Sequence, residues 1–224
     1  MCGLAGILTT RDDRRRSLPE SLGRMTDTIV HRGPDSDGIW SDAECGIGLG
    51  FRRLAILDLS PLGEQPMRSA SGRYTLVFNG EVYNHGELRA ELEPLGARFR
   101  GRSDTEALLA AFEAWGVRRA IPRFAGMFAI AVWDAEERTV TLARDRMGKK
   151  PLFVSHAPGL VFFGSELKAL AADPAFDRSV DVDSVAEYLR YVYVPGPATI
   201  FERTLKLPPG HLLRIRDAAA PLPA

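Results

Sequence analysis

The spacing of hydrophobic residues changes several times along the chain, and each spacing predicts a different element. Residues 2–8 (CGLAGIL) are apolar and rich in glycine, which is typical of a short buried strand. Over 18–29, apolar residues recur at helical spacing behind Pro19, so this segment predicts a helix. Residues 31–38 (HRGPDSDG) follow, and their glycine, proline and aspartate indicate a loop.

The next apolar segments predict three further strands. Apolar residues alternate with glycine over 47–51, whereas 54–57 (LAIL) is a continuous apolar run, and an arginine pair lies between these two strands. A third strand is expected over 73–78 (RYTLVF). Asn79 and Gly80 would end it, because this dipeptide is typical of a tight hairpin turn.

Two helices are expected after these strands, each with an N-terminal capping signal. Asn84 has the chemistry of an N-cap and Glu87 follows it, ahead of the segment ELRAELEPLG. Ser103 and Glu106 form a capping box before ALLAAFEAWG, and Gly116 is suited to end that helix.

The remainder of the chain is rich in strands and supports an α+β fold. Four consecutive strands are predicted from the apolar segments MFAIAVWD, TVTLARD, PLFVSH and LVFFGSE. DVDSVAEYLRYV then predicts a helix, and LPPGHLLRI a turn that leads into a last strand. Adjacent strands joined by short turns favour antiparallel sheets covered by helices over a doubly wound parallel sheet.

Composition limits the classes of partner. The chain has 224 residues, of which 45% are hydrophobic, and its 29 basic residues balance its 29 acidic ones. This balance gives no reason to expect nucleic acid or an anionic membrane as a partner. The N-terminus lacks a secretory signal and no segment approaches the roughly 20 apolar residues of a membrane span, so we expect a cytoplasmic protein.

Cys2 is the first candidate for chemistry. Removal of Met1 would leave a thiol and a free α-amine on the same residue, and the amine could accept the thiol proton. Alone this signal is weak, because small residues commonly follow the initiator methionine. Cys45, the other cysteine, shares no metal-finger spacing with Cys2 and is expected to be a small core residue.

Seven motifs occur together in a recognisable order: MCGLAGIL, HRGPDSDG, RRLAILDLSP, FNGEVYN, RSDTEALL, RDRMGKKPLF and SELKAL. In this order they resemble the N-terminal glutaminase domain of glutamine-hydrolysing asparagine synthetases, a class II glutamine amidotransferase. The resemblance covers nearly the whole chain. It implies an N-terminal nucleophile hydrolase fold, a four-layer αββα sandwich of antiparallel sheets. It also implies that Cys2 attacks the carboxamide of L-glutamine.

The resemblance also implies roles for other residues, each of which has a simpler structural explanation. Arg53 would bind the glutamine α-carboxylate, although an exposed arginine at a strand edge is the commoner case. Asn79 and Gly80 would form the oxyanion hole rather than a turn. Asp104 would pair with the α-ammonium, although an acid in the first turn of a helix is also favoured by the helix dipole. The remaining expected glutamine contacts are Leu54, Ala55, Ile56, Leu57 and Glu81.

The expected domain is 1–215, including a C-terminal extension from about 180, with 216–224 as a linker to an ATP-dependent synthetase domain. No cofactor or metal is expected in this chain, since ATP and Mg²⁺ would bind the synthetase domain. The sequence leaves open whether the chain forms a homodimer. It is also compatible with an amidotransferase domain that serves another ammonia acceptor, and with a catalytically silent scaffold.

Two further segments bear on the expected pocket and its surroundings. RDRMGKKPLF lacks a Walker pattern, so a structural or interface role is expected for it. Phe51 stands where many members of the family have histidine, which affects the polarity of the expected pocket.

Overall fold

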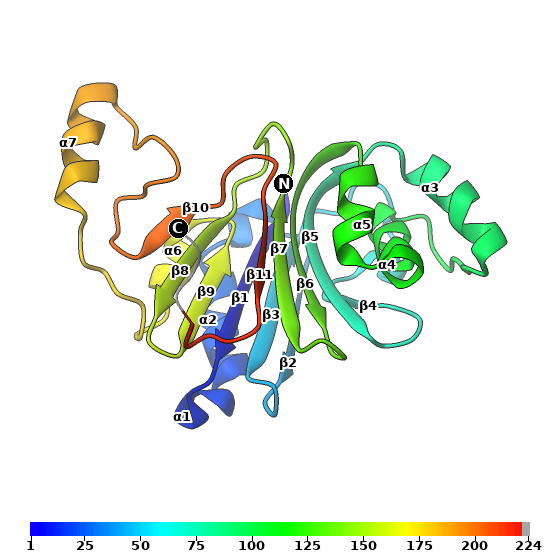
Figure 1. The fold of residues 1–224 in the computed structure, drawn as a ribbon, viewed down its shortest axis with the longest axis horizontal. Helices are drawn as coiled ribbons and strands as arrows, with labels where there is room; N and C mark the ends of the chain where they lie inside the picture. Colours follow the sequence, from blue (N-terminus) through cyan, green and yellow to red (C-terminus); the bar gives the residue numbers. More distant parts are fainter. Residues whose placement is uncertain (221–224) are drawn as a thin grey trace.

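The computed structural model describes residues 1–220 and contains two antiparallel sheets stacked face to face (Figure 1). The six-stranded sheet has the order β10 (Thr204–Lys206), β8 (Phe153–Ala157), β9 (Leu160–Gly164), β1 (Gly3–Thr9), β3 (Ile47–Arg53) and β2 (Ser36–Asp42). The five-stranded sheet has the order β11 (Leu212–Ile215), β7 (Thr139–Arg144), β6 (Gly126–Asp134), β5 (Tyr74–Val82) and β4 (Met67–Arg68).

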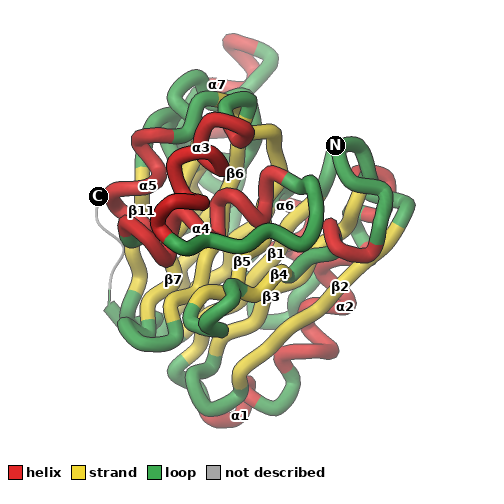
Figure 2. The backbone as a smooth tube through the Cα atoms, turned by 90° about the vertical axis from the view of Figure 1, so that its right-hand side faces the viewer, coloured by secondary structure: helices red, strands yellow, loops and turns green. Residues whose placement is uncertain are grey.

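Helices cover the outer face of each sheet, which gives four layers. On the six-stranded sheet lie α2 (Leu18–Asp27) and α6 (Leu167–Ala171). On the five-stranded sheet lie α3 (His85–Leu92), α4 (Asp104–Trp115) and α5 (Val117–Ala120), which Figure 2 shows in front of the strands. The short α1 (Asp12–Arg15) precedes α2, and α7 (Val182–Tyr191), orange in Figure 1, lies apart from both sheets.

The strand β1 shows why both faces of the sheets are apolar. Successive side chains point to opposite faces of a strand. Leu4 and Leu8 therefore join the core between the two sheets, whereas Ala5 and Ile7 join the core beneath α2 and α6. Because both faces are buried, the strand is a continuous apolar run rather than an alternating one.

Glycines of β3 allow α2 to approach the six-stranded sheet closely. A Cβ atom at Gly48 would lie 2.6 Å from the Cδ1 atom of Leu22, and one at Gly50 would lie 2.7 Å from the Cγ2 atom of Thr26. The apolar residues of the helix are fully buried against this surface. The alternation of glycine with larger residues in β3 is thus a packing requirement of the helix above it.

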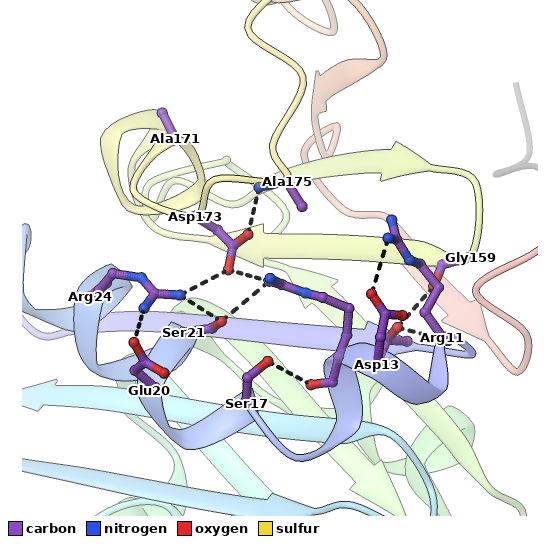
Figure 3. Close-up of polar contacts among 12 residues, drawn as sticks. Arg11, Asp13, Ser17, Glu20, Ser21, Arg24, Gly159, Ala171, Asp173 and Ala175 are labelled. Carbon is purple, nitrogen blue, oxygen red and sulfur yellow. Dashed lines mark hydrogen bonds and ion pairs between the residues drawn. The ribbon is translucent and has the colours of Figure 1, made fainter.

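A buried carboxylate ties the N-terminal helices to the segment after α6 (Figure 3). The side chain of Asp173 is wholly buried, and it accepts hydrogen bonds from the Arg14 guanidinium at 2.5 Å and from the Ala175 amide at 2.8 Å. Arg24 lies 3.9 Å from the same carboxylate. Segments 159 residues apart in the sequence are therefore joined by a charge-assisted hydrogen bond.

The predicted α+β sandwich of antiparallel sheets is confirmed, but two local predictions were wrong. Residues 54–57 do not form a strand: β3 ends at Arg53, and Ile56 and Leu57 are 68% and 44% exposed. Within 31–38, predicted as a loop, a 3₁₀ turn covers Val30–Arg32 and β2 begins at Ser36. Polar and glycine-rich residues are tolerated there because β2 is an edge strand with no neighbour on its other side.

Predictions about the ends of elements were also partly wrong. Asn79 and Gly80 do not end a strand, since β5 continues to Val82. The helix α3 starts after Asn84 as predicted, but the Asn84 side chain does not cap it and instead bonds the backbone of Arg123 and Ala125. Tertiary hydrogen bonds displaced the local ones in this case.

The second capping signal is confirmed in part. The Ser103 hydroxyl accepts the Glu106 amide at 3.4 Å, and Gly116, with φ of 74°, ends α4. The Glu106 carboxylate, however, accepts the amides of Arg100 and Gly101 rather than that of Ser103. Half of the predicted capping box is therefore present.

Candidate functional site

A cleft of about 310 Å³ lies where the ends of the two sheets and the start of α4 meet. The register of β1 and β3 pairs Gly3 with Arg52, so Cys2 lies beside the residues that follow Arg52. The predicted site residues that line the cleft are Cys2, Arg53, Leu54, Ile56, Leu57, Asn79, Gly80, Glu81 and Asp104. Ala55 is not among the lining residues, and its amide donates to Asp35 at 2.8 Å.

The thiol of Cys2 is held against the backbone of Leu54. The Leu54 amide donates to Sγ at 3.4 Å, and the thiol is 3.5 Å from the Leu54 carbonyl oxygen, which it can reach as a donor. Burial raises the pKa of the thiol, and the Leu54 N–H opposes this rise. The thiolate therefore needs support from the charges and donors of the cleft before it can act as a nucleophile.

Arg32, from HRGPDSDG, fixes the backbone of Cys2. Its Nε donates to the Cys2 carbonyl oxygen at 2.9 Å, and its Nη1 donates to Glu166 at 2.9 Å. Although partial burial opposes it, hydrogen bonds from Arg32, His31 and Lys168 hold the pKa of Glu166 below its ordinary value. The HRGPDSDG motif is recognisable in the sequence, but nothing in the sequence indicates that Arg32 bonds the backbone of Cys2.

The carboxamide of Asn79 is buried and lacks a complete set of partners. The residue is 1% exposed, and within residues 1–220 its Nδ2 atom has no hydrogen-bond acceptor. Val77, two residues earlier on β5, faces the core between the sheets, so the Asn79 side chain faces the same gap in which Cys2 lies. A buried amide without an acceptor is costly, so this donor is free to bond an acceptor atom placed in the cleft.

Gly80 presents its backbone on the open edge of β5. Gly80 is paired with Phe128 on β6. The backbone N–H and C=O of Phe128 bond Asp145, on the side of β6 away from β5. In an antiparallel ladder the two residues of such a pair both direct their backbone groups away from each other, so the Gly80 N–H and C=O point away from β6. The edge amides of Phe78 and Val82 donate to Gln65 and Asp104. The Gly80 N–H lies between these two bonds and faces the cleft.

Packing, rather than a turn, requires glycine at position 80. A Cβ atom there would lie 2.2 Å from the Met127 carbonyl oxygen and 2.7 Å from the Phe128 Cα atom. Any larger residue would push β5 away from β6 and displace the neighbouring Asn79. The position of both donors thus depends on one close contact between strands.

The two arginines that end β3 point in different directions. Arg53 is buried in the cleft, where it donates to the carbonyl oxygens of Asp58 and Ser60. Arg52 lies outside and pairs with Asp27 and Asp37. Alternation along the strand therefore assigns only Arg53 to the site.

The loop around Arg53 is organised by the carboxylate of Asp58. Its oxygens accept hydrogen bonds from Ser60 and from the Arg102 amide, and these lower the pKa of Asp58 to about 2. The loop curls closely round the guanidinium, because a Cβ atom at Gly63 would lie 2.4 Å from its Nη2 atom. Residues 54–57 are thus part of a loop that holds the Arg53 guanidinium in place.

Asp104 opens α4 and faces the cleft. It is 5% exposed, and its Oδ2 atom accepts the Val82 amide at 3.0 Å. Burial raises the pKa of this carboxyl, and the Val82 hydrogen bond acts in the opposite direction. A carboxylate and a guanidinium, Asp104 and Arg53, therefore line the same cavity.

Several lining residues were not predicted as site residues. Gln65 bonds the Phe78 backbone and the Thr105 hydroxyl, so it joins β5 to the start of α4. Phe51 is fully buried and gives the cleft an apolar wall. The other unpredicted lining residues are Met1, Asp58, Gly63, Phe78, Ser103, Thr105, Met127 and Lys150.

Cys45 and the four histidines are not among the residues that line this cleft. Cys45 is partly buried at the turn between β2 and β3, against the core between the sheets. Within residues 1–220 no group of three or more histidine, cysteine or acidic residues is arranged to hold a metal ion. None of the helices described there is both long and apolar enough to cross a membrane.

Comparisons with known proteins agree with this geometry. The family model for the glutamine amidotransferase domain matches residues 1–222. Asparagine synthetase [glutamine-hydrolyzing] 1 of Bacillus subtilis is 38% identical over 217 residues, which cover 96% of this chain and 34% of the relative. A putative asparagine synthetase [glutamine-hydrolyzing] of Mycobacterium tuberculosis H37Rv is 37% identical over 238 residues, or 99% of this chain and 36% of the relative.

Solved structures share the fold at lower identity. The glutamine phosphoribosylpyrophosphate amidotransferase of B. subtilis has a TM-score of 0.63 at 20% identity and covers 76% of this chain and 43% of its own. A structure described as the allosteric regulatory enzyme of purine biosynthesis has a TM-score of 0.68 at 19% identity, covering 96% of this chain and 47% of its own.

This chain spans about a third of the length of the curated relatives that it matches. The family match and the identity to those relatives extend over nearly all of the chain. The chain therefore belongs to the glutamine amidotransferase domain family, in the form found in glutamine-hydrolysing asparagine synthetases.

Proposed function

We propose that Cys2, after removal of Met1, is the nucleophile with which this domain hydrolyses L-glutamine to glutamate and ammonia. One observation carries the proposal: the Cys2 thiol shares its cleft with a buried Asn79 amide that lacks an acceptor. The Gly80 N–H supplies a second donor at the same place. This combination is what an oxyanion formed by attack on a carboxamide requires.

The reaction proceeds through a thioester. The α-amine of Cys2, with a reference pKa of about 7.7–8.0, takes the thiol proton as Sγ bonds to the carboxamide carbon of glutamine. The carbonyl π electrons move onto oxygen, which accepts hydrogen bonds from Asn79 and Gly80. When the tetrahedral intermediate collapses, the C–N bond breaks and the ammonium of Cys2 returns the proton to the leaving nitrogen. Water then attacks the thioester, releasing glutamate and restoring the thiol.

Two charged residues would distinguish glutamine from a simple amide. The Arg53 guanidinium suits the α-carboxylate, and the Asp104 carboxylate suits the α-ammonium. Glu81 and the loop residues Leu54, Ile56 and Leu57 line the remaining wall. Ala55 is best regarded as a support for this loop, through its bond to Asp35, rather than as a contact.

The ammonia would serve asparagine synthesis from aspartate and ATP in a C-terminal synthetase domain, where ATP and Mg²⁺ would bind. The identity to asparagine synthetases supports this acceptor over a phosphoribosyl compound, since the likeness to the phosphoribosylpyrophosphate enzyme is one of fold. We place the domain at 1–215 and a linker at 216–224, of which 221–224 lie outside the described residues. A nucleophilic thiol and an ATP-dependent partner suit the cytoplasm.

Replacement of the nucleophile tests the proposal directly. We expect Cys2→Ala to lower the rate of ammonia release from glutamine by about a thousandfold or more, because covalent catalysis is lost. Cys45→Ala is the matched control and should retain the wild-type rate. Coupled detection of glutamate and ammonia would measure both. Equal activity in Cys2→Ala and wild type would refute the role of Cys2 and favour a silent scaffold.

The oxyanion hole gives a second prediction. Asn79→Ala should lower kcat about a hundredfold or more with little change in KM, because the lost donor acts on the transition state. Asn84→Ala is the control, since its side chain bonds only the backbone of other segments. It should lower the thermal stability slightly and leave kcat unchanged. An equal loss of kcat in the two variants would contradict the assignment.

Asp104 should set the acidic side of the pH profile. Its folded pKa is raised by burial, so on acidification the carboxylate is neutralised at a higher pH than that of an exposed aspartate. We expect kcat/KM to fall as the pH drops through this pKa, and Asp104→Asn to remove that dependence. The variant should also raise KM by roughly 30-fold or more, as expected for the loss of one partner of a buried charge pair. A wild-type acidic limb in Asp104→Asn would assign the titration to another group.

A further inference from the structure

The loop between β7 and β8 places a buried lysine in the candidate active site. The side chain of Lys150 is 6% exposed and lines the cleft together with Cys2 and Asn79. No carboxylate within residues 1–220 lies within 4.0 Å of its ammonium group. The Lys150 Nζ atom is not among the fully buried, unpartnered side-chain nitrogens of residues 1–220, so the ammonium group reaches the cleft itself, where it can interact with a negative charge that forms there.

The backbone of this loop is rigidly held, which fixes the direction of Lys150. The wholly buried Asp145 carboxylate accepts the amides of Phe128, Met147, Lys149 and Lys150. Arg144 donates to the Lys150 carbonyl oxygen at 2.8 Å. The neighbouring Lys149 is exposed, so the loop directs one lysine into the cleft and the other into solvent.

The other charges around Cys2 change when glutamine binds. Burial raises the pKa of the thiol, and the positive charges that oppose this rise belong to the amino terminus, Arg53 and Lys150. An α-amine that acts as a base must be neutral, and the α-carboxylate of glutamine would neutralise Arg53. Arg32 is already paired with Glu166. Among these described cations, Lys150 is then the one that has no counter-charge.

The acidic residues of the cleft do not neutralise the positive charge of Lys150. The Asp58 carboxylate accepts hydrogen bonds from the Ser60 hydroxyl and the Arg102 amide. The Asp104 carboxylate accepts the Val82 amide, and in the proposed complex it would also pair with the glutamine ammonium. Glu81 also lines the cleft, but among the described residues it forms no ion pair with Lys150. The positive charge of Lys150 therefore remains available at the reacting end of the substrate.

We propose that the Lys150 ammonium stabilises the negative charge of the reaction, first on the Cys2 thiolate and then on the oxyanion held by Asn79 and Gly80. This inference rests on the proposed function of Cys2. Lys150 acts electrostatically across the cleft and exchanges no proton with the substrate. It supplements the two hydrogen-bond donors, and a low-dielectric cavity strengthens its effect.

Thiol reactivity and turnover in three lysine variants test this role. Each variant is made in the full chain with Cys45→Ala, so that Cys2 is the remaining thiol, and removal of Met1 is verified by mass. Lys150→Met removes the charge and keeps the length, Lys150→Arg keeps the charge, and Lys149→Met is the matched control. Iodoacetamide alkylation against pH gives the titration midpoint of Cys2, and glutamine hydrolysis gives kcat and KM.

We expect Lys150→Met to move the alkylation midpoint upward by about one pH unit, as loss of a nearby charge predicts. The same variant should lower kcat by about tenfold or more and change KM by less than about threefold. Lys150→Arg should retain most of both properties, and Lys149→Met should match the parent. A thermal melt separates these effects from a loss of folded protein.

Three results would overturn the role of Lys150. They are an unshifted midpoint in Lys150→Met, a kcat equal to that of Lys149→Met, and an arginine variant as impaired as the methionine variant. A lower melting temperature with an unshifted midpoint would show a structural role only. Each of these leaves the parent protein active, whereas failure of the proposed function would appear as a parent protein that releases no ammonia.

Discussion

The antiparallel pairing of β1 with β3 is the constraint on which the site depends. The pairing of Gly3 with Arg52 places the N-terminal residue beside the end of β3, so a thiol at position 2 meets Leu54 and shares a cleft with Arg53. The facing sheet then brings Asn79 to the same gap. A shift of β1 by one residue would turn each of its side chains to the other face, and the thiol would leave the cleft.

Much of this arrangement could be predicted from the sequence, because periodicity and ordered motifs carry it. The apolar runs predicted most strands, and the motifs drew together residues from position 2 to position 104 that do line one cleft. The motifs could not show how each residue is held. Residues 54–57 have the composition of a strand, but their loop supplies the turn whose carbonyl oxygens hold Arg53. The hydrogen bonds that hold Arg53 therefore outweigh the strand propensity of residues 54–57.

The remaining errors have the same physical origin. Asn79-Gly80 is a turn dipeptide by local chemistry, yet β5 runs through it because residues 79–82 pair with β6, and the close approach of Met127 and Phe128 requires glycine at position 80. RDRMGKKPLF was expected to have a structural or interface role, and Asp145 does hold the backbone of this loop, but the sequence could not tell which of two adjacent lysines points inward. That direction is decided by the backbone bonds of the folded loop, which no local pattern reports.

The proposed mechanism depends on a Cys2 thiol whose own α-amine is the base, and N-terminal processing tests that proposal most directly. Met1 is 58% exposed at the edge of the cleft, so its retention is compatible with the fold. The measurement compares glutamine hydrolysis by protein that begins at Cys2 with protein that retains Met1, each verified by intact mass. We expect the Met1 form to melt at the same temperature and release no ammonia above background. Full activity in the Met1 form would contradict the role of the α-amine.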